Sequence, residues 1–310
     1  MTGRKIRVVI VGGGIGGLVA ATFLAQHRHQ VTVLERRQRY AESEFLEAAQ
    51  GINLTKNVWT CFAALGMTSD FEQISDYGKD CTVRKHIDGS TARVVNSLNG
   101  HRFVHRTNLP TLLFHFATKA GAAVLQGESF TEINDSNEGV TLQLQSIKEL
   151  AADLVIGCDG IHSKRYHLQM SDHTYGTGTA YNLDEADTEG AFVERYSNMH
   201  AFRKRWSDFE PAIRDLLGET AAVTKWRIAE LPELPSWASE SGKLVLLGDA
   251  AHAFPPWSGE NSNVEAQQPS ANEAIPSGAK GAWSTMERYK WIDEYDAVAE
   301  AHNCHFDAKL

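Results

Sequence analysis

A glycine-rich turn near the N-terminus has the residue types and spacing of a phosphate-binding loop. An apolar run over residues 6–11 leads directly into Gly12, Gly14 and Gly17, which are spaced as GxGxxG. Gly12 allows a tight turn, Gly14 lets a diphosphate approach the backbone without a Cβ in the way, and Gly17 allows close packing of helix and strand. Free N–H groups and the partial positive charge at the start of the following helix then favour an anion.

An acidic residue stands where such a unit needs a hydrogen-bond acceptor. Glu35 ends the second apolar run, residues 31–34, and its carboxylate can accept hydrogen bonds from both hydroxyls of a ribose. Each such charge-assisted bond contributes about 1.5–3 kcal/mol. Arg36 follows directly, and we include it with the three glycines and Glu35 in the expected cofactor site. Strand, turn, helix, strand and acid together predict a dinucleotide-binding unit; a tight turn without a ligand is the alternative.

The rest of the chain alternates between helical and extended patterns, which is typical of an α/β protein. Asn108 is expected to cap a helix whose apolar stripe consists of Leu109, Leu112, Leu113 and Phe116. Further expected helices cover the segment that ends near residue 66, residues 208–217 and residues 283–302. Expected strands cover residues 82–84, 93–95, 122–125, 140–144, 154–156, 179–183, 223–228 and 243–247. Residues 260–281 are polar, with few large apolar side chains, so we expect little packing there.

Composition excludes several classes of function. The 310 residues are 42% hydrophobic and 22% charged, as in an ordinary soluble globular protein, and the net charge of −9 disfavours a nucleic-acid partner. No apolar run approaches the ~20 residues of a membrane span, and the first strand begins too early for a signal peptide. Cys61, Cys81, Cys158 and Cys304 have no CxxC spacing, so neither zinc nor a disulfide framework is indicated. We expect a cytoplasmic protein without a metal site, the histidine-containing tail at residues 302–305 included.

Three separated motifs resemble one family when they are taken together. The GxGxxG turn is followed by ADLVIGCDGIHS at residues 152–163 and by KLVLLGDAAHAFPP at residues 243–256. In this order they resemble the FAD-dependent aromatic hydroxylases of the para-hydroxybenzoate and salicylate hydroxylase type, the group A flavoprotein monooxygenases. GINLTKN at residues 51–57, His105–Arg106 and WIDEYDA at residues 291–297 are also similar to segments of that family.

The resemblance implies further cofactor contacts. It places Gly51 beside the flavin, Arg106 on a stretch of FAD, Asp159 between FAD and the nicotinamide donor, and Asp249 at the ribityl chain. An N-cap role without a ligand is the alternative for Asp249. His252 is expected to be a buried structural histidine, because the flavin itself performs the oxygen chemistry.

The resemblance also implies the architecture and the activity. We expect a Rossmann-like FAD-binding domain built from residues 1–77, 106–170 and 243–310, with a smaller, trimmed β-rich substrate domain at 78–105 and 171–242. The implied reaction uses FAD, NAD(P)H and O₂ to hydroxylate a phenolic or salicylate-like small molecule through a flavin C4a-hydroperoxide. No residue is assigned as the catalytic base.

Two departures from the family pattern keep other functions open. The segment between Asp159 and Asp249 is short for the family's substrate-binding sheet, and Asn261 stands where a glycine is expected. The arginine that would close the central motif is also displaced, with Tyr166 in its place and Arg165 just before. A degenerate FAD-binding protein without hydroxylase activity and an NAD-dependent dehydrogenase are the alternatives.

Overall fold

The computed structural model describes thirteen stretches of the chain. They are residues 4–38, 51–77, 81–85, 87–95, 101–105, 108–136, 138–160, 174–176, 180–182, 193–196, 198–219, 223–226 and 234–253. The predictions for Arg106, Arg165, Tyr166, Asn261 and all segments beyond residue 253 lie outside the described residues.

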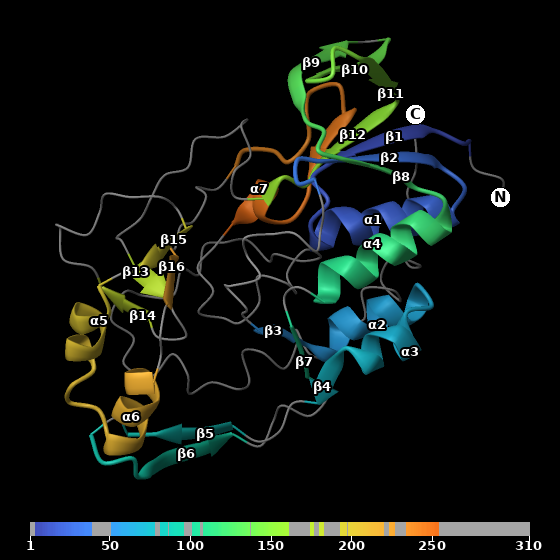
Figure 1. Cartoon of the computed structure of the whole chain (residues 1–310). Coiled ribbons are helices and arrows are strands. Elements are labelled where there is room, and N and C mark those ends of the chain that lie inside the picture. Colours follow the sequence, from blue (N-terminus) through green and yellow to red (C-terminus); the bar gives the residue numbers. More distant parts are fainter. Residues whose placement is uncertain are drawn as a thin grey trace.

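A five-stranded parallel sheet forms the centre of the molecule (Figure 1). Its order is β17–β12–β1–β2–β8, and every neighbouring pair is parallel. The strands are β17 (Leu244–Leu246), β12 (Leu154–Gly157), β1 (Arg7–Val11), β2 (Gln30–Glu35) and β8 (Ala123–Gln126). Helix α1 (Ile15–Gln26) crosses from β1 to β2, and α4 (Asn108–Ala120) leads into β8. This parallel core with crossover helices confirms the α/β prediction.

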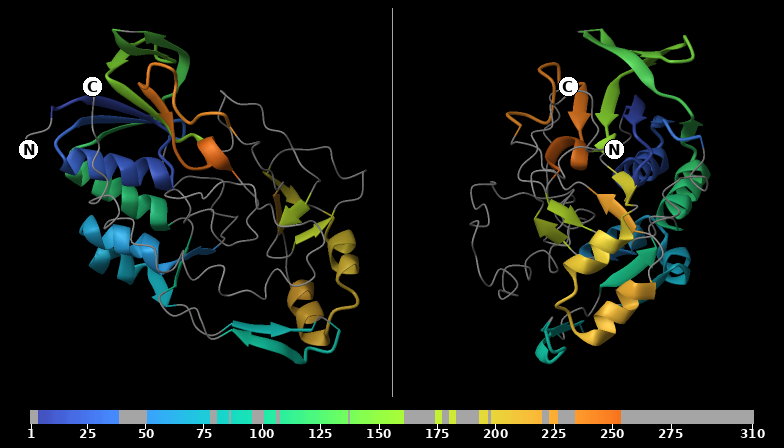
Figure 2. Two further views of the ribbon diagram at one scale, coloured as in Figure 1. Left: turned by 180° about the vertical axis from the view of Figure 1, so that it is seen from behind. Right: turned by 60° about the vertical axis from the view of Figure 1, so that its left-hand side comes forward.

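Alternate residues of β1 enter two different cores, because side chains of a strand point to opposite faces. Val8 and Ile10 pack with α1 and α4, whereas Val9 and Val11 pack against a three-stranded antiparallel sheet. That sheet consists of β9 (Phe130–Ser136), β10 (Gly139–Leu144) and β11 (Glu149–Ala152), in the order β11–β10–β9. The helices and the small sheet therefore cover opposite faces of the central sheet (Figure 2).

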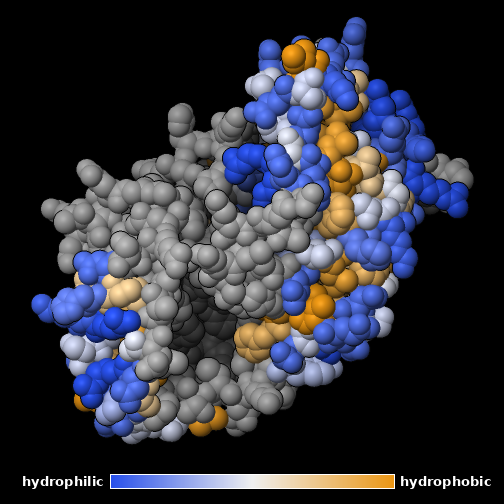
Figure 3. Space-filling model, in the orientation of Figure 1, coloured by the Kyte–Doolittle hydropathy of each residue, from blue (hydrophilic) through white to orange (hydrophobic). Residues whose placement is uncertain are grey.

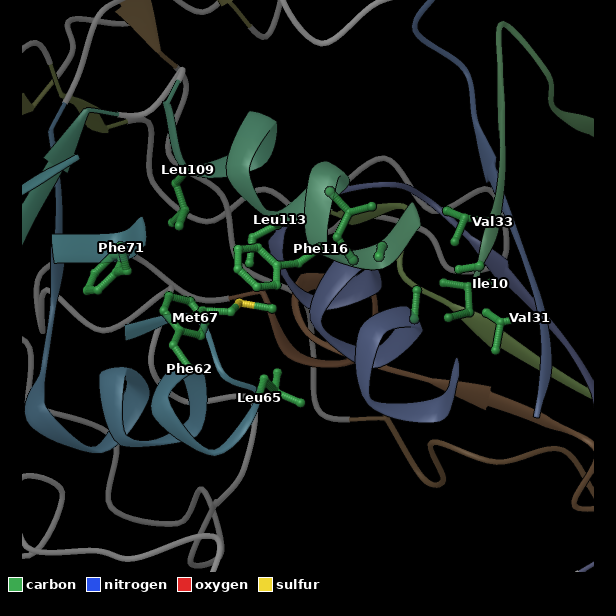
Figure 4. Close-up of a cluster of buried hydrophobic side chains, with 14 of the residues drawn as sticks. Ile10, Val31, Val33, Phe62, Leu65, Met67, Phe71, Leu109, Leu113 and Phe116 are labelled. Carbon is green, nitrogen blue, oxygen red and sulfur yellow. The ribbon is translucent and has the colours of Figure 1, made fainter. Parts of the chain in front are cut away.

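A second helical layer extends the core beyond α4. Helices α2 (Lys56–Ala64) and α3 (Thr68–Gln73) bring Phe62, Met67 and Phe71 against Leu113 and Phe116 of α4 (Figure 4). The rings of Phe62 and Phe71 meet edge to face, with centroids 5.1 Å apart. Full burial of each of these side chains contributes about 1.5–3 kcal/mol, so this layer anchors α4 and, through α4, the sheet.

The remaining elements form small antiparallel sheets and short helices. One sheet has the order β3–β7–β4, and three further strand pairs are separate hairpins or ladders. The strands are β3 (Gly51–Leu54), β4 (Ser75–Tyr77), β7 (Arg102–His105), β5 (Cys81–Arg84) with β6 (Thr91–Val95), β13 (Thr174–Gly176) with β14 (Ala180–Asn182), and β15 (Val193–Tyr196) with β16 (Val223–Trp226). The helices are α5 (Met199–Arg205), α6 (Pro211–Glu219) and α7 (Asp249–His252).

Several elements differ from the sequence prediction. Helix α6 begins at Pro211 rather than near residue 208, because proline is favoured in the first turn, where its missing N–H costs nothing. Helices α3 and α5 and strands β9 and β11 were not expected. The sequence of β9, FTEINDS, is mostly polar, and its exposed residues do not alternate regularly with less exposed ones, so periodicity could not reveal it.

On the face seen in Figure 3, most of the coloured surface is polar. In the space-filling view, apolar side chains gather in a band that runs down from the β9–β11 sheet and is flanked by polar ones (Figure 3). Within the described stretches, every helix is too short or too polar to traverse a lipid bilayer.

Candidate functional site

Four strands of the central sheet end in one row. Val11 of β1 lies opposite Leu34 of β2 on one side and Gly157 of β12 on the other, and Gly157 lies opposite Leu246 of β17. Neighbouring strands are about 4.8 Å apart, so the residues that follow these four positions emerge side by side. This carboxyl-terminal edge is where open α/β sheets bind ligands.

Two of the three motif glycines are required by the packing of the chain itself. Gly12 has φ +106°, and a Cβ there would lie 2.3 Å from the carbonyl oxygen of Cys158. A Cβ on Gly17 would lie 2.0 Å from the carbonyl oxygen of Gly12. The turn therefore fits tightly between α1 and the end of β12, and neither position can hold a larger residue without a backbone shift.

Gly14 differs from its two neighbours in the motif. It is the N-cap of α1 with an ordinary φ of −75°, and an added Cβ would meet no atom of the described residues within 4 Å. The protein's own packing thus gives no reason for glycine here. The open space adjoins the first turn of α1, whose N–H groups have no partner inside the helix. A diphosphate fits such a cradle, and a Cβ would fill it.

Glu35 is buried and supports the glycine turn directly. The residue is only 5% exposed, and Oε2 accepts a hydrogen bond of 2.9 Å from the backbone N–H of Gly13. Oε1 accepts one of 2.8 Å from the backbone N–H of Arg37, whose Nε lies 3.4 Å away. Each carboxylate oxygen has a further lone pair with which it can accept from a ligand hydroxyl. Sequence reasoning missed this bracing role, because nothing in the motif marks Gly13 as a partner.

The two aspartates from the later motifs emerge at the same edge. Asp159 follows β12 so closely that its backbone nitrogen would lie 2.8 Å from a Cβ on Gly12. Asp249 is the first residue of α7, directly after Gly248, which has φ +66° and ψ −145°. The structure thus brings the glycine turn, Glu35, Asp159 and Asp249 together along one sheet edge.

The other predicted site residues are placed differently. Gly51 lies on β3 of the neighbouring antiparallel sheet, paired with His105 of β7. Arg36 is exposed beside the buried Glu35. Arg106 would follow His105 but is not among the described residues. The cofactor roles of all these residues stay predictions.

His252 ends α7 and packs against an aromatic ring that sequence reasoning did not assign to the site. The imidazole and the indole of Trp237 have centroids 5.0 Å apart and are inclined by 31°. Burial lowers the pKa of His252 below its ordinary 6.5, and a backbone hydrogen bond and the charge of Asp249 oppose that shift in part. His252 is half-buried rather than buried as expected, and its structural role stays a prediction. Among the described residues, no group of three or more His, Cys, Asp or Glu side chains could hold a metal ion.

The sequence of this chain is similar to those of known proteins. The family model described as "FAD binding domain" matches residues 5–207, more than half of the chain. FAD-dependent monooxygenase OpS4 of Beauveria bassiana is 24% identical over 327 residues, covering 84% of this chain and 74% of that protein. Salicylate hydroxylase of Pseudomonas putida is 26% identical over 325 residues, covering 82% and 72%.

A solved structure shows the same fold at lower sequence identity. The crystal structure of CtdE in complex with FAD superposes with a TM-score of 0.68 at 18% identity, covering 84% of this chain and 81% of that one. The family match, the monooxygenase relatives and the parallel-sheet core agree with each other. The chain belongs to the FAD binding domain family and, within it, to the FAD-dependent aromatic hydroxylases.

Proposed function

We propose that this protein is an NAD(P)H- and FAD-dependent monooxygenase that hydroxylates a small phenolic or salicylate-like ring. The observation that carries the proposal is the open cradle at Gly14, in line with Glu35, Asp159 and Asp249 at one sheet edge. An elongated dinucleotide needs contacts from several distant loops, and the residues of this row would provide them. The monooxygenases among the relatives support the same activity.

Each residue of the row has a role that its chemistry allows. The first turn of α1 would hold the diphosphate through its N–H groups, with Gly14 leaving room for close approach. Glu35 would accept hydrogen bonds from the adenosine ribose while its other lone pairs hold the turn. Asp249 would accept a hydrogen bond from a ribityl hydroxyl, and Asp159 would contact FAD beside Gly12.

The chain's own contribution to the reaction is to bind FAD, to orient the substrate and to shield the reacting atoms from water. Bound FAD, reduced by NAD(P)H, supplies the activation of O₂ and the transfer of one oxygen atom to the ring. The protein must keep water away from the reacting atoms so that oxygen is transferred rather than lost as hydrogen peroxide. Gly51 of β3 and Arg106 are the residues proposed to line the flavin, and no base is assigned.

The proposed division into domains follows the distribution of the sheets. The antiparallel pairs β5–β6, β13–β14 and β15–β16 are separate from the central sheet and lie away from it (Figure 1). This supports residues 78–105 and 171–242 as a trimmed substrate domain with two exceptions. In the first range β7 pairs with β3, and in the second Ala238 pairs with Val245 of β17 in the central sheet. A reducing, cytoplasmic location is also proposed, because the four cysteines are scattered along the sequence without CxxC spacing.

The first experiment tests cofactor binding. Purified protein is titrated with FAD and with NAD⁺, and binding is followed through flavin absorption and calorimetry, with Gly14→Ala as the matched variant. Tight FAD binding that Gly14→Ala weakens supports the site. A colourless protein that takes up no added FAD contradicts the proposal, and binding of NAD⁺ alone would favour a dehydrogenase.

The second experiment separates hydroxylation from cofactor binding. NAD(P)H consumption, hydrogen peroxide and hydroxylated product are measured together for a panel of phenols and salicylates. Product in proportion to NAD(P)H consumed supports a hydroxylase. Tight FAD binding with only peroxide, or with no turnover, would identify a degenerate family member instead.

A further inference from the structure

Helix α7 carries Asp249 but cannot hold its own conformation. It has only four residues, and its turn is closed by hydrogen bonds from the N–H groups of Ala251 and His252 to the carbonyl oxygen of Gly248, at 2.8 and 3.1 Å. A single turn fixes several dihedral angles for very few hydrogen bonds, so an isolated helix of this length is unstable. Contacts from elsewhere in the chain must therefore hold it.

These contacts come from residues 234–240, which line the outer edge of β17. The carbonyl oxygen of Trp237 accepts a hydrogen bond of 2.8 Å from the N–H of Leu246, and Ala238 bridges to Val245 in the antiparallel sense. Leu234 packs on the small cluster that contains the buried Ala250 and Ala251. The segment is thus fixed to the last strand of the sheet and touches α7 from the side.

Trp237 adds the contact at the end of α7. Its indole lies on the imidazole of His252, with ring centroids 5.0 Å apart and an angle of 31° between the planes. Trp237 is 39% exposed, so the ring does not simply fill the core. Its backbone is held by β17 while its side chain touches the last residue of α7, and the ring therefore couples the position of α7 to the sheet.

We propose that Trp237 is a positioning residue for the cofactor site, which acts through His252 to fix α7 and hence Asp249. The inference rests on the proposed function, because Asp249 matters for catalysis only if FAD binds there. Trp237 itself touches no reacting atom in this proposal. A ring that only covers the edge of β17 is the competing explanation, and it predicts no link to Asp249.

A set of matched variants tests this link in the full chain. Trp237→Ala removes the ring, and Trp237→Phe keeps an aromatic surface on His252. Phe23→Ala is the control, because Phe23 is a partly exposed ring of α1 that packs on His27 in a similar way, with centroids 4.2 Å apart and an angle of 34°. FAD dissociation constants are measured for each variant, for Asp249→Ala and for the double variant Trp237→Ala/Asp249→Ala. Amide hydrogen exchange of residues 249–252 is measured without FAD.

The expected result is a coupled pair of residues. Trp237→Ala should weaken FAD binding by about tenfold and speed amide exchange in α7, whereas Trp237→Phe and Phe23→Ala should stay near wild type. The double variant should bind FAD about as weakly as Asp249→Ala alone, because both changes remove the same interaction.

Other results would overturn the inference in distinguishable ways. If wild type binds FAD and Trp237→Ala binds it equally well, only the positioning role fails. If the two single effects add in the double variant, Trp237 does not act through Asp249. If wild type takes up no FAD, the proposed function fails and the positioning role fails with it, whatever the exchange data show.

Discussion

Two strand–turn–helix units lie at the same edge of the central sheet and are stabilised in different ways. The first joins β1 to the twelve-residue α1, and the second joins β17 to the four-residue α7. The first is held mainly by residues 7–35, because Glu35 accepts a hydrogen bond from Gly13 and Gly17 packs on the carbonyl group of Gly12, and its turn also packs on Cys158 after β12. The second depends on residues 234–240 and on the buried faces of its two alanines.

The first unit is therefore stabilised mostly by contacts within residues 7–35, whereas the second depends on contacts from a preceding segment of the chain. A defect in the first unit disrupts the centre of the sheet and should lower the stability of the whole domain. A defect in the second should open α7 locally, since elements with few buried contacts open at a small fraction of the global free energy.

The largest effect is expected from Gly17→Ala. Its Cβ would meet the carbonyl oxygen of Gly12 at 2.0 Å, so backbone must shift in the core and the free energy of unfolding should fall by about 3 kcal/mol. Gly14→Ala is the control, because its Cβ would meet no atom within 4 Å in the described part of the chain. Urea unfolding followed by circular dichroism measures both. Equal stability of the two variants would contradict the conclusion that the close packing of Gly17 on Gly12 stabilises the domain.

The second effect is expected from Glu35→Ala. Removal of the carboxylate leaves the N–H groups of Gly13 and Arg37 without their acceptor, and a buried unsatisfied group costs about 1–3 kcal/mol. Arg37→Ala is the control, because Arg37 is 47% exposed and such an ion pair contributes at most about 1 kcal/mol. The urea midpoint should fall clearly for Glu35→Ala and little for Arg37→Ala. A larger fall of the midpoint for Arg37→Ala than for Glu35→Ala would show that the Glu35 carboxylate does not stabilise the turn.

The third effect is expected from Gly248→Ala and should be local. With φ +66° and ψ −145°, Gly248 has a conformation that costs other residues about 1–3 kcal/mol. Because α7 is held weakly, we expect faster amide exchange at residues 249–252 with little change in the global urea midpoint. A fall in that midpoint as large as for Gly17→Ala would contradict the contrast between the two units.

The first unit, which joins β1 to α1, is also the one that the sequence predicts well. Its strand, turn, helix and acid are contiguous in the first 35 residues, so local spacing contains nearly all the information. The sequence likewise places Asp159 and Asp249 after buried strands, and parallel strands bring such positions to one edge. The stripe of α4 was predicted for the same reason of periodicity.

Long-range contacts explain most of what the sequence could not predict. The stack of Trp237 on His252 and the pairing of residues 234–240 with β17 join segments whose own patterns carry no signal of each other. The hydrogen bond from Gly13 to Glu35 depends on side-chain placement rather than on residue type. Short polar elements such as α5 and β9 lack the periodicity that would reveal them.

The dependence of α7 on pH gives a smaller effect. Burial lowers the pKa of His252 in the folded protein below 6.5, so the unfolded chain takes up this proton first as the pH falls. The resulting contribution to stability is complete above pH 6.5 and is lost as the pH decreases toward the folded pKa. His252→Phe should remove that loss while the ring contact remains. The difference in unfolding free energy between wild type and variant is measured across pH 6.5. A difference that stays constant with pH would contradict the predicted loss of stability from His252.

The smallest effect is expected at the opposite edge of the sheet. The carboxylate of Asp153, before β12, accepts hydrogen bonds from the backbone N–H of Arg7 at 2.7 Å and from its guanidinium at 2.8 Å, and these bonds lower the pKa of Asp153 from 3.8 to about 2. Since the folded pKa is depressed, the contribution to stability is present above pH 3.8 and is lost as the pH falls toward about 2. Asp153→Asn should flatten the acid limb of the stability curve in this window only slightly, because the pair is partly exposed, with side chains 48% and 34% accessible. FAD affinity and the amide exchange of α7 should not change, because the pair lies at the amino ends of β1 and β12; a change in either would show that the two edges of the sheet are coupled.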